Sequence, residues 1–323
     1  SGCGKTTLLR MVAGLEEPTE GDIFIKGKRI NDTPIHKRNL GMIFQNYALF
    51  PHKNIFDNVA FGLKYRDVSK EEVNTKVTRA LEMVRLPGVE NRMPSQLSGG
   101  QQQRIAMARA IVIEPDVLLM DEPLSALDEN LREEMRREVD NLQQMLGVTT
   151  IFVTHDQREA LSMSDKILVM KAGRKQQEGS PEAVYNEPAN HFVADFLGHS
   201  NFIAGEVLAV ENNHVNVRIE TGDVLFAENK GGFSTGDRVE IIVRAQRFDA
   251  FPKDEFQPVE GMNHFEGRIK DRSYMGGEVS YFIELAADRE IHIISMMRTR
   301  LYEIGEAVSV QVSPHHCHLI PME

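Results

Sequence analysis

Three short apolar runs constrain the fold of the N-terminal part more than any other feature. They are VLLM at 117–120, TTIFVT at 149–154 and KILVM at 166–170. Strands that are apolar along their whole length are buried on both faces, and they alternate with helices in parallel sheets. Between the first two runs, apolar residues recur at helical spacing and Gly147 follows, as at a helix C-terminus. The sequence therefore predicts a mostly parallel sheet covered on both sides.

Further elements are predicted around this sheet. Residues 21–30 alternate in polarity and indicate a hairpin. Residues 39–45 form a short apolar strand pattern that ends on Gln45. Residues 46–115 are mostly helical in pattern, which predicts a helical subdomain inserted between the strands.

The composition changes near Gly198. From Asn201 onward the chain offers short alternating strands broken by Gly, Asn and Asp, which predicts an all-β domain over 199–323, a small barrel. FIAGEV at 202–207 and FEGRI at 265–269 indicate a weak internal repeat. The predicted domains are therefore 1–198 and 199–323.

Length and composition limit the class of protein. A chain of 323 residues has room for two domains. A net charge of −11 argues against a general nucleic-acid binder, which needs a surplus of Lys and Arg. Cys3 and Cys317 make no disulfide framework, and no apolar run approaches the roughly 18 residues of a membrane span. We expect a soluble cytosolic protein, and because Ser1 is not Met, a native start that lies upstream.

The first residues, SGCGKTT, match the last part of the phosphate-binding pattern G-x-x-x-x-G-K-[ST]. Glycine lets backbone N–H groups converge on phosphate oxygens, and Gly4 stands where this is needed. Lys5 would reach the β and γ phosphates, and Thr6 would place a hydroxyl on Mg²⁺. The alternative is a glycine-rich turn before an ordinary helix.

LSGGQ at 97–101 has a structural and a functional interpretation. Ser98 and Gln101 have the spacing of a capping box, which needs no further role. The adjacent Gly99 and Gly100 disfavour a helix, and they make sense where an anion must approach bare backbone at the positive helix end.

VLLMDEP and the segments after it carry the polar groups. Asp121 follows a buried strand, where phosphate-loop enzymes hold Mg²⁺, and Glu122 could accept a proton from water. SALD adds Ser125 and Asp128, and strand TTIFVT leads to His155 at a strand-to-helix corner. Taken singly, the acidic pair could be a solvated strand end and the histidine structural.

The order of these motifs resembles the ATP-binding cassette (ABC) family over residues 1–198. Phosphate loop, strand-end Gln45, LSGGQ, strand-DE, SALD and strand-TH occur once each, in the family's order. The resemblance implies an α/β P-loop (RecA-like) nucleotide-binding domain with an inserted helical subdomain at about 46–115, followed by an all-β, OB-like (TOBE) domain.

The family's ATPases work as head-to-tail pairs, which implies that this chain forms a homodimer and binds ATP and Mg²⁺. Ser98, Gly99 and Gly100 would contact the γ-phosphate held by the other copy, and Asp128, with Ser125 more loosely, would tie the halves together. The implied ATP-contacting residues are Ser1, Gly2, Cys3, Gly4, Lys5, Thr6, Thr7, Gln45, Ser98, Gly99, Gly100, Gln101, Asp121, Asp128 and His155.

The resemblance also implies catalytic roles. Thr6, Gln45 and Asp121 would serve Mg²⁺. Glu122 would act as the general base toward the attacking water, and His155 would clamp the γ-phosphate and sense its loss. Because the family places a strand and an adenine-stacking aromatic before the loop, the sequence resembles a fragment, and we expect residues 1–323 alone to bind ATP weakly or not at all.

A β-rich tail after one cassette resembles importers of polyamines, sugars, sulfate, ferric iron and phosphonates. NYALFPHKNIFDNVAFGLK and DEPLSALDENLREEM are most similar to the spermidine/putrescine members. Two integral-membrane permeases and, indirectly, a periplasmic solute-binding protein would be the partners, at the cytoplasmic face of the inner membrane. Arg244-Ala245-Gln246 and Lys175 depart from that branch's pattern and leave another solute open.

Other interpretations remain to be weighed against this one. Residues 47–63 would dock the permease, or their aromatic rings would fill the helical subdomain. PHHCH at 314–318 offers metal-ligating types without a second cluster, which favours a terminal strand. A cassette ATPase acting on nucleic acid would carry coiled-coil insertions, zinc cysteines or a second cassette. A non-catalytic regulator would lack Glu122 or His155, and the β-rich tail disfavours an exporter.

Overall fold

The computed structural model describes residues 2–125, 127–212, 214–286, 289–296 and 300–322. The chain divides into two compact units. The first comprises residues 1–164 and 170–174, and the second comprises 165–169 and 175–323. No helix in these described ranges combines the length and the apolar character that crossing a bilayer requires. The domain limits expected from the sequence remain predictions.

A parallel sheet of three strands, in the order β3-β4-β5, forms the centre of the first unit. In β4, Leu118 and Met120 join the core that α4 and α5 contribute, whereas Val117 and Leu119 pack with α1. Both faces of the sheet are therefore covered by helices, which confirms the prediction. The strands are β3 (Leu40–Ile43), β4 (Val117–Asp121) and β5 (Thr149–Val153).

The third apolar run does not join this sheet. It forms β6 (Ile167–Lys171), which pairs with β7 (Arg174–Gly179) in a separate two-stranded sheet. The two-residue loop between them explains the pairing, since Ala172 and Gly173 have φ of 48° and 77°. Positive φ at both loop residues gives a turn whose twist suits a hairpin. The run was expected in the parallel sheet, and that expectation is corrected.

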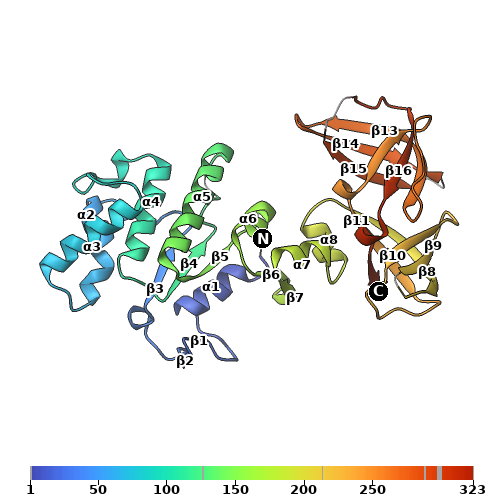
Figure 1. Cartoon of the computed structure of the whole chain (residues 1–323). Helices are drawn as coiled ribbons and strands as arrows, with labels where there is room; N and C mark the ends of the chain where they lie inside the picture. Colours follow the sequence, from blue (N-terminus) through green and yellow to red (C-terminus); the bar gives the residue numbers. More distant parts are fainter. Residues whose placement is uncertain (1, 126, 213, 287–288, 297–299, 323) are drawn as a thin grey trace. The chain divides into compact units, whose positions relative to one another are not determined.

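The region expected to be helical, 46–115, contains α2, α3 and α4, drawn in blue to teal in Figure 1. Capping boxes of Ser69 with Glu72 and of Ser98 with Gln101 begin α3 and α4. The hairpin expected at 21–30 is present as β1 and β2. Bounds are β1 (Phe24–Ile25), β2 (Lys28–Arg29), α1 (Lys5–Ala13), α2 (Ile55–Val59), α3 (Lys70–Met83), α4 (Gly99–Ile111), α5 (Glu129–Leu146) and α6 (Gln157–Met163).

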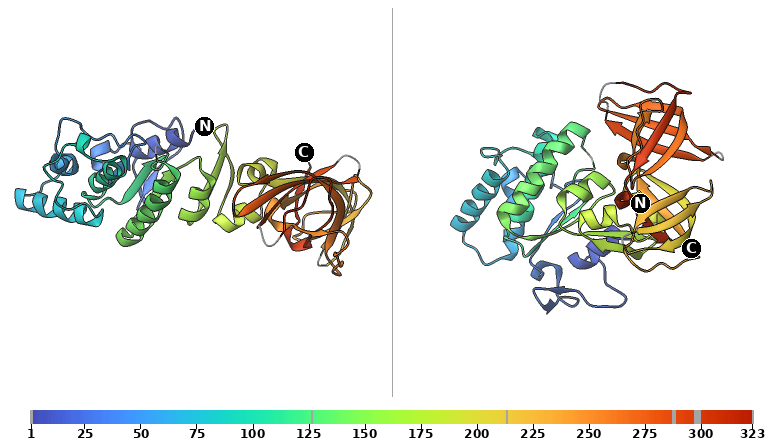
Figure 2. Two further views of the ribbon diagram at one scale, coloured as in Figure 1. Left: turned by 90° about the horizontal axis from the view of Figure 1, so that it is seen from above. Right: turned by 45° about the vertical axis from the view of Figure 1, so that its right-hand side comes forward.

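The second unit contains two five-stranded antiparallel sheets where the sequence predicted a single barrel (Figure 2). Their orders are β10-β9-β8-β11-β17 and β12-β16-β13-β14-β15. The elements are α7 (Pro181–Asn186), α8 (His191–Phe196), β8 (Ser200–Val210), β9 (His214–Ile219), β10 (Val224–Glu228), β11 (Arg238–Arg244), β12 (Asp249–Pro252), β13 (Asn263–Tyr274), β14 (Glu278–Glu284), β15 (Glu290–Met296), β16 (Ala307–Val312) and β17 (His318–Pro321).

The weak sequence repeat marks the same strand in each sheet. Gly205 lies in β8 and Gly267 in β13, and each of these is the central strand of its sheet. A Cβ on Gly205 would lie 2.5 Å from Val217 Cγ1, and a Cβ on Gly267 would lie 2.6 Å from Ile283 Cγ2. Each glycine thus lets the next strand approach closely, and a bulge follows it in both strands.

Two buried asparagines connect the sheets reciprocally. Asn201 in β8 donates to His292 O at 2.7 Å and accepts from His292 N at 2.7 Å. Asn263 in β13 makes the same pair with Phe226, at 2.7 Å to O and 2.7 Å from N. His292 and Phe226 lie on β15 and β10, which are edge strands. Each sheet therefore satisfies backbone groups on the edge of the other.

Arg244 holds the segment that leads into these sheets. Its guanidinium donates to Tyr185 O at 2.7 Å and to Ser200 Oγ at 2.8 Å, and it stacks 4.2 Å from the centre of the Tyr185 ring. Only 5% of the residue is exposed, and burial lowers the pKa of its guanidinium. Within the segment 244–246, which departs from the pattern of the polyamine branch, Arg244 therefore has an internal structural role.

Candidate functional site

The phosphate-loop residues form a tight turn that opens directly into α1. Gly2 and Gly4 have φ of 79° and 90°, a region that favours glycine. Gly4 is the N-cap of α1 and provides no side-chain cap, so the first N–H groups of the helix remain for a ligand. Lys5 Nζ lies 3.5 Å from Cys3 Sγ. Ser1 lies outside the described residues.

Thr6 and Asp121 lie side by side, as the sequence predicts for a Mg²⁺ site. The Thr6 hydroxyl donates to Asp121 Oδ1 at 2.9 Å, although 115 residues separate them. A hydroxyl and one carboxylate are hard oxygen ligands of the kind that Mg²⁺ uses together with substrate phosphates. No cluster of three His, Cys, Asp or Glu side chains suited to a metal ion occurs among the described residues. Thr7, also expected near ATP, is exposed.

Glu122 is held between two other predicted residues. Gln45 Nε2 donates to Glu122 Oε2 at 3.3 Å, and His155 Nδ1 lies 3.3 Å from Glu122 Oε1. The Glu122 backbone has φ of 46°, and its N–H donates to Val153 O at 2.9 Å. The parallel strands β3, β4 and β5 deliver these three side chains at their carboxyl ends, where parallel sheets place ligand sites.

Gln45 is hydrogen-bonded to the loop that follows β4. Its amide donates to Glu122 and to Ser125 Oγ, each at 3.3 Å, and its expected role toward Mg²⁺ remains a prediction. Ser125 in turn donates to Glu122 O at 2.9 Å, which fixes the loop after β4. Asp128 is exposed and caps α5 through Leu131 N at 3.0 Å. Its expected contact with a second copy remains a prediction.

The signature segment, LSGGQ at 97–101, begins α4 and shows the predicted capping box. Ser98 N donates to Gln101 Oε1 at 3.0 Å, and Gln101 N donates to Ser98 Oγ at 3.4 Å, so the capping box is real. Gly99 is exposed, and among the described residues no atom beyond its chain neighbours and its own helix backbone lies within 4 Å of where its Cβ would stand. Gly100 is buried, 3.4 Å from Leu131 Cδ1 by the same measure. The helix start is open at Gly99, and the contact with a γ-phosphate in trans remains a prediction.

Arg109 is a residue that the sequence analysis missed. From α4, it donates to Tyr47 O at 2.7 Å and to Ala48 O at 2.6 Å, whose residues have φ of 60° and 45°. Burial lowers the pKa of its guanidinium. A cation in the otherwise apolar stretch IAMARAI, residues 105–111, was the available signal. Arg109 connects the helix of the signature segment to the backbone just after Gln45.

The remaining candidates are divided. Phe56 packs against the core, and the rings of Phe50 and Phe61 lie 4.6 Å apart, so aromatics of 47–63 fill the subdomain; docking through this segment remains a prediction. In 314–318, His318 Nε2 lies 3.0 Å from Pro188 O and begins β17, as expected for a terminal strand.

Comparison with known proteins agrees with this geometry. The family model described as ABC transporter matches residues 1–125, and the TOBE domain model matches residues 241–320. The chain is 44% identical to the spermidine/putrescine import ATP-binding protein PotA of Clostridium novyi, over 99% of this chain and 87% of that protein. It is 44% identical to PotA of Legionella pneumophila strain Philadelphia 1, over 100% of this chain and 89% of the relative.

Among solved structures, cbiO1 from Clostridium perfringens, part of the ABC transporter complex cbiONQ, is 32% identical with a TM-score of 0.53. The match covers 57% of this chain and 75% of cbiO1. The phosphate loop beside a strand-end carboxylate agrees with the two family models and with relatives that match nearly the whole chain. The chain belongs to the ABC transporter family of ATP-binding proteins, in the group that carries a C-terminal TOBE domain.

Proposed function

We propose that this chain is the ATP-hydrolysing subunit of an importer of spermidine and putrescine. The observation that carries the proposal is the position of Glu122, which lies between Gln45 and His155 at 3.3 Å from each. Relatives 44% identical over nearly the whole chain are named as spermidine/putrescine import ATP-binding proteins, which supports the choice of solute.

The residues divide the work of hydrolysis. The N–H groups at the start of α1, with Lys5, bind phosphate oxygens. Thr6 and Asp121, 2.9 Å apart, would hold Mg²⁺, which neutralises developing charge on the phosphates. Glu122 accepts a proton from the attacking water, and the amide of Gln45 fixes one of its carboxylate oxygens. His155, whose side chain is 60% exposed, can leave Glu122 for the γ-phosphate.

The assembly is part of the proposal. Two copies pair head to tail, so that the open Gly99 of one copy faces the phosphates held by the other. Two permease subunits form the membrane path, and a solute-binding protein delivers the polyamine from outside. The ATPase subunits then lie at the cytoplasmic face of the membrane.

Glu122→Gln in the full-length protein tests the catalytic step. Removing the base should lower the rate of ATP hydrolysis by about 10² to 10⁴ while ATP binding persists, so that an ATP-bound dimer accumulates. Steady-state hydrolysis and size-exclusion chromatography with ATP measure both effects. Glu17→Gln, at an exposed carboxylate, is the matched control. Turnover at the normal rate in Glu122→Gln would remove this role.

Uptake distinguishes the solute. Cells that lack the gene should lose energy-dependent uptake of labelled spermidine and recover it with the wild-type gene, but not with the Glu122→Gln gene. Normal polyamine uptake in the deletion strain, with loss of uptake of a sugar or ferric iron, would contradict the choice of solute and leave the motor role in place.

A further inference from the structure

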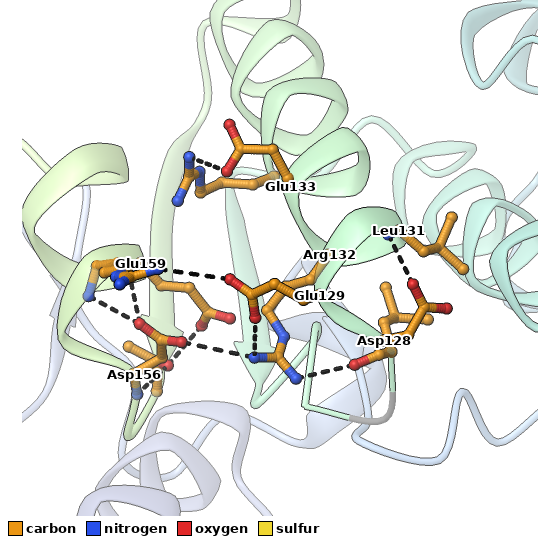
Figure 3. A network of polar contacts seen from close by, with 11 residues as sticks. Asp128, Glu129, Leu131, Arg132, Glu133, Asp156 and Glu159 are labelled. Atoms are coloured by element: carbon orange, nitrogen blue, oxygen red, sulfur yellow. Dashed lines mark hydrogen bonds and ion pairs between the residues drawn. The ribbon is translucent and has the colours of Figure 1, made fainter. Parts of the chain in front are cut away.

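A network of charged groups connects two loops of the candidate site, and Arg132 lies at its centre (Figure 3). One loop precedes α5 and contains Ser125 and Asp128. The other is the corner after β5, where His155 is followed by Asp156 and α6. Sequence patterns assigned neither loop a partner within its own chain.

Arg132 binds the first loop through its backbone. Its Nη2 donates to Leu127 O at 2.8 Å, one residue before Asp128. Leu127 is buried, and a buried carbonyl needs a hydrogen-bond partner within the protein. Arg132 is that partner. The opposite end of the same guanidinium, Nη1, donates to Glu129 Oε2 at 3.2 Å. Glu129 is 70% exposed, and an ion pair so exposed contributes little.

The second loop is reached through Asp156. Asp156 Oδ2 lies 3.7 Å from Arg132 Nη1, and the two side chains are only 27% and 28% exposed. The other carboxylate oxygen, Oδ1, accepts from Arg158 N at 2.7 Å and from Glu159 N at 3.2 Å and so caps α6. This cap fixes Asp156, the residue directly after His155, to the backbone at the start of α6.

The position of Arg132 is unfavourable on local grounds. It stands in the first turn of α5, where the helix dipole disfavours a cation. Its Nε is buried and has no hydrogen-bond partner among the described residues. A residue that violates local preference in this way requires compensation from specific contacts, and Leu127 O and Asp156 supply them.

We propose that Arg132 is a positioning residue that couples the loop carrying Ser125 and Asp128 to the corner carrying His155. This inference rests on the proposed function, because it assigns the two loops to ATP hydrolysis. Contact with a second copy displaces the loop before α5. The Arg132 guanidinium transmits this displacement to Asp156, and His155 moves relative to Glu122. Arg132 itself touches neither nucleotide nor the attacking water.

The test compares kcat and KM for ATP in the full-length protein. Arg132→Gln should lower kcat about tenfold and change KM less than about twofold, since phosphate binding by the loop before α1 is untouched. Arg132→Lys should be intermediate, because a single ammonium keeps the charge facing Asp156 but cannot also reach Leu127 O. Arg136→Gln, one turn further along α5 with its ion pair to Glu133, is the matched control and should keep the wild-type kcat.

Asp156→Asn separates coupling from folding. Asparagine still caps α6 but removes the charge, so kcat should fall as in Arg132→Gln, and the double variant should be no worse than either single variant. Additive losses in the double variant, or a wild-type kcat in Arg132→Gln, would overturn the proposal. If Arg132→Gln folds poorly, Asp156→Asn still decides, because a wild-type kcat there overturns it as well.

Hydrogen exchange without nucleotide gives a readout that does not depend on ATP hydrolysis. Arg132→Gln should speed amide exchange in peptides spanning 154–160, and Arg136→Gln should not. Unchanged exchange in Arg132→Gln would count against the coupling. A wild-type protein that fails to hydrolyse ATP would instead contradict the proposed function, so the two failures are distinguishable.

Discussion

At the scale of single residues, Glu122 combines a strained backbone with a place in the candidate site. A non-glycine residue in the left-handed region costs roughly 1 kcal/mol, and such residues gather at functional sites where the surroundings hold them. Glu122 has φ of 46°, and Val153 O, Gln45 and Ser125 all hold it. The carboxylate of this residue lies 3.3 Å from His155 Nδ1.

Gly41 gives a prediction at the same scale. A Cβ at Gly41 would lie 2.5 Å from Ala110 O and 3.0 Å from Leu118 Cδ1, where α4 crosses β3. Because a backbone carbonyl cannot move aside cheaply, Gly41→Ala should lower the free energy of unfolding by about 1–3 kcal/mol. Urea unfolding measures it. Gly99→Ala, whose Cβ would meet nothing, is the control; equal stability of both variants would contradict the argument.

At the scale of elements, the sequence predicted the helices and strands that the spacing of apolar residues determines. The fully buried β4, the helices of 46–115 and the hairpin at 21–30 all followed from the spacing of apolar residues. The pairing of KILVM did not follow from this spacing, because the apolar run of β6 resembles that of β4. The two residues of positive φ between β6 and β7 decide the pairing. The sequence showed the repeat at 202–207 and 265–269, but it did not predict that the two copies lie in the central strands of two separate sheets.

The asparagines that connect the sheets give a prediction for these elements. Asn201→Ala removes two 2.7 Å hydrogen bonds and leaves the N–H and C=O of His292 without that partner. Losing a buried partner of this kind should cost about 2–3 kcal/mol of stability. Asn263→Ala should cost a similar amount, because its geometry with Phe226 is the same. Asn212→Ala, at an exposed position, serves as the control in chemical unfolding. If Asn201→Ala lost as little stability as this control, the stabilising role of the asparagine contacts would be contradicted.

At the scale of the whole molecule, the structure brings together residues that the sequence relates only through the order of their motifs. Thr6 and Asp121 meet across 115 residues, and Gln45, Glu122 and His155 meet from three strands. Patterns did not predict that the Gln45 amide donates to Glu122 and Ser125, because side-chain hydrogen bonds between strand ends leave no motif in the sequence. Arg109 and Arg132 escaped notice because their partners are backbone carbonyls and a helix cap, which leave no motif in a sequence.

Three half-buried histidines predict that the second unit is sensitive to acid. Burial lowers the pKa of His292, helped by His199 and opposed by Glu290, and burial also lowers the pKa values of His316 and His318. Below a pH of about 6.5 these three histidines therefore bind more protons in the unfolded state than in the folded state, so the stability that they contribute is complete above that pH and is lost as pH falls.

The melting temperature should accordingly drop between about pH 7.5 and about pH 5.5. His292→Phe, which keeps a ring for stacking on Phe282 and removes the titrating group, should show a smaller drop. Differential scanning calorimetry at both pH values checks this. A drop equal to that of the wild type would show that His292 does not contribute.

The reciprocal asparagine contacts have an evolutionary consequence. Deleting either sheet would leave the backbone N–H and C=O on the edge of the other, at His292 or at Phe226, without the asparagine that pairs with them. Recombination that transfers β8 through β17, from Ser200 to Pro321, as one block keeps both pairs.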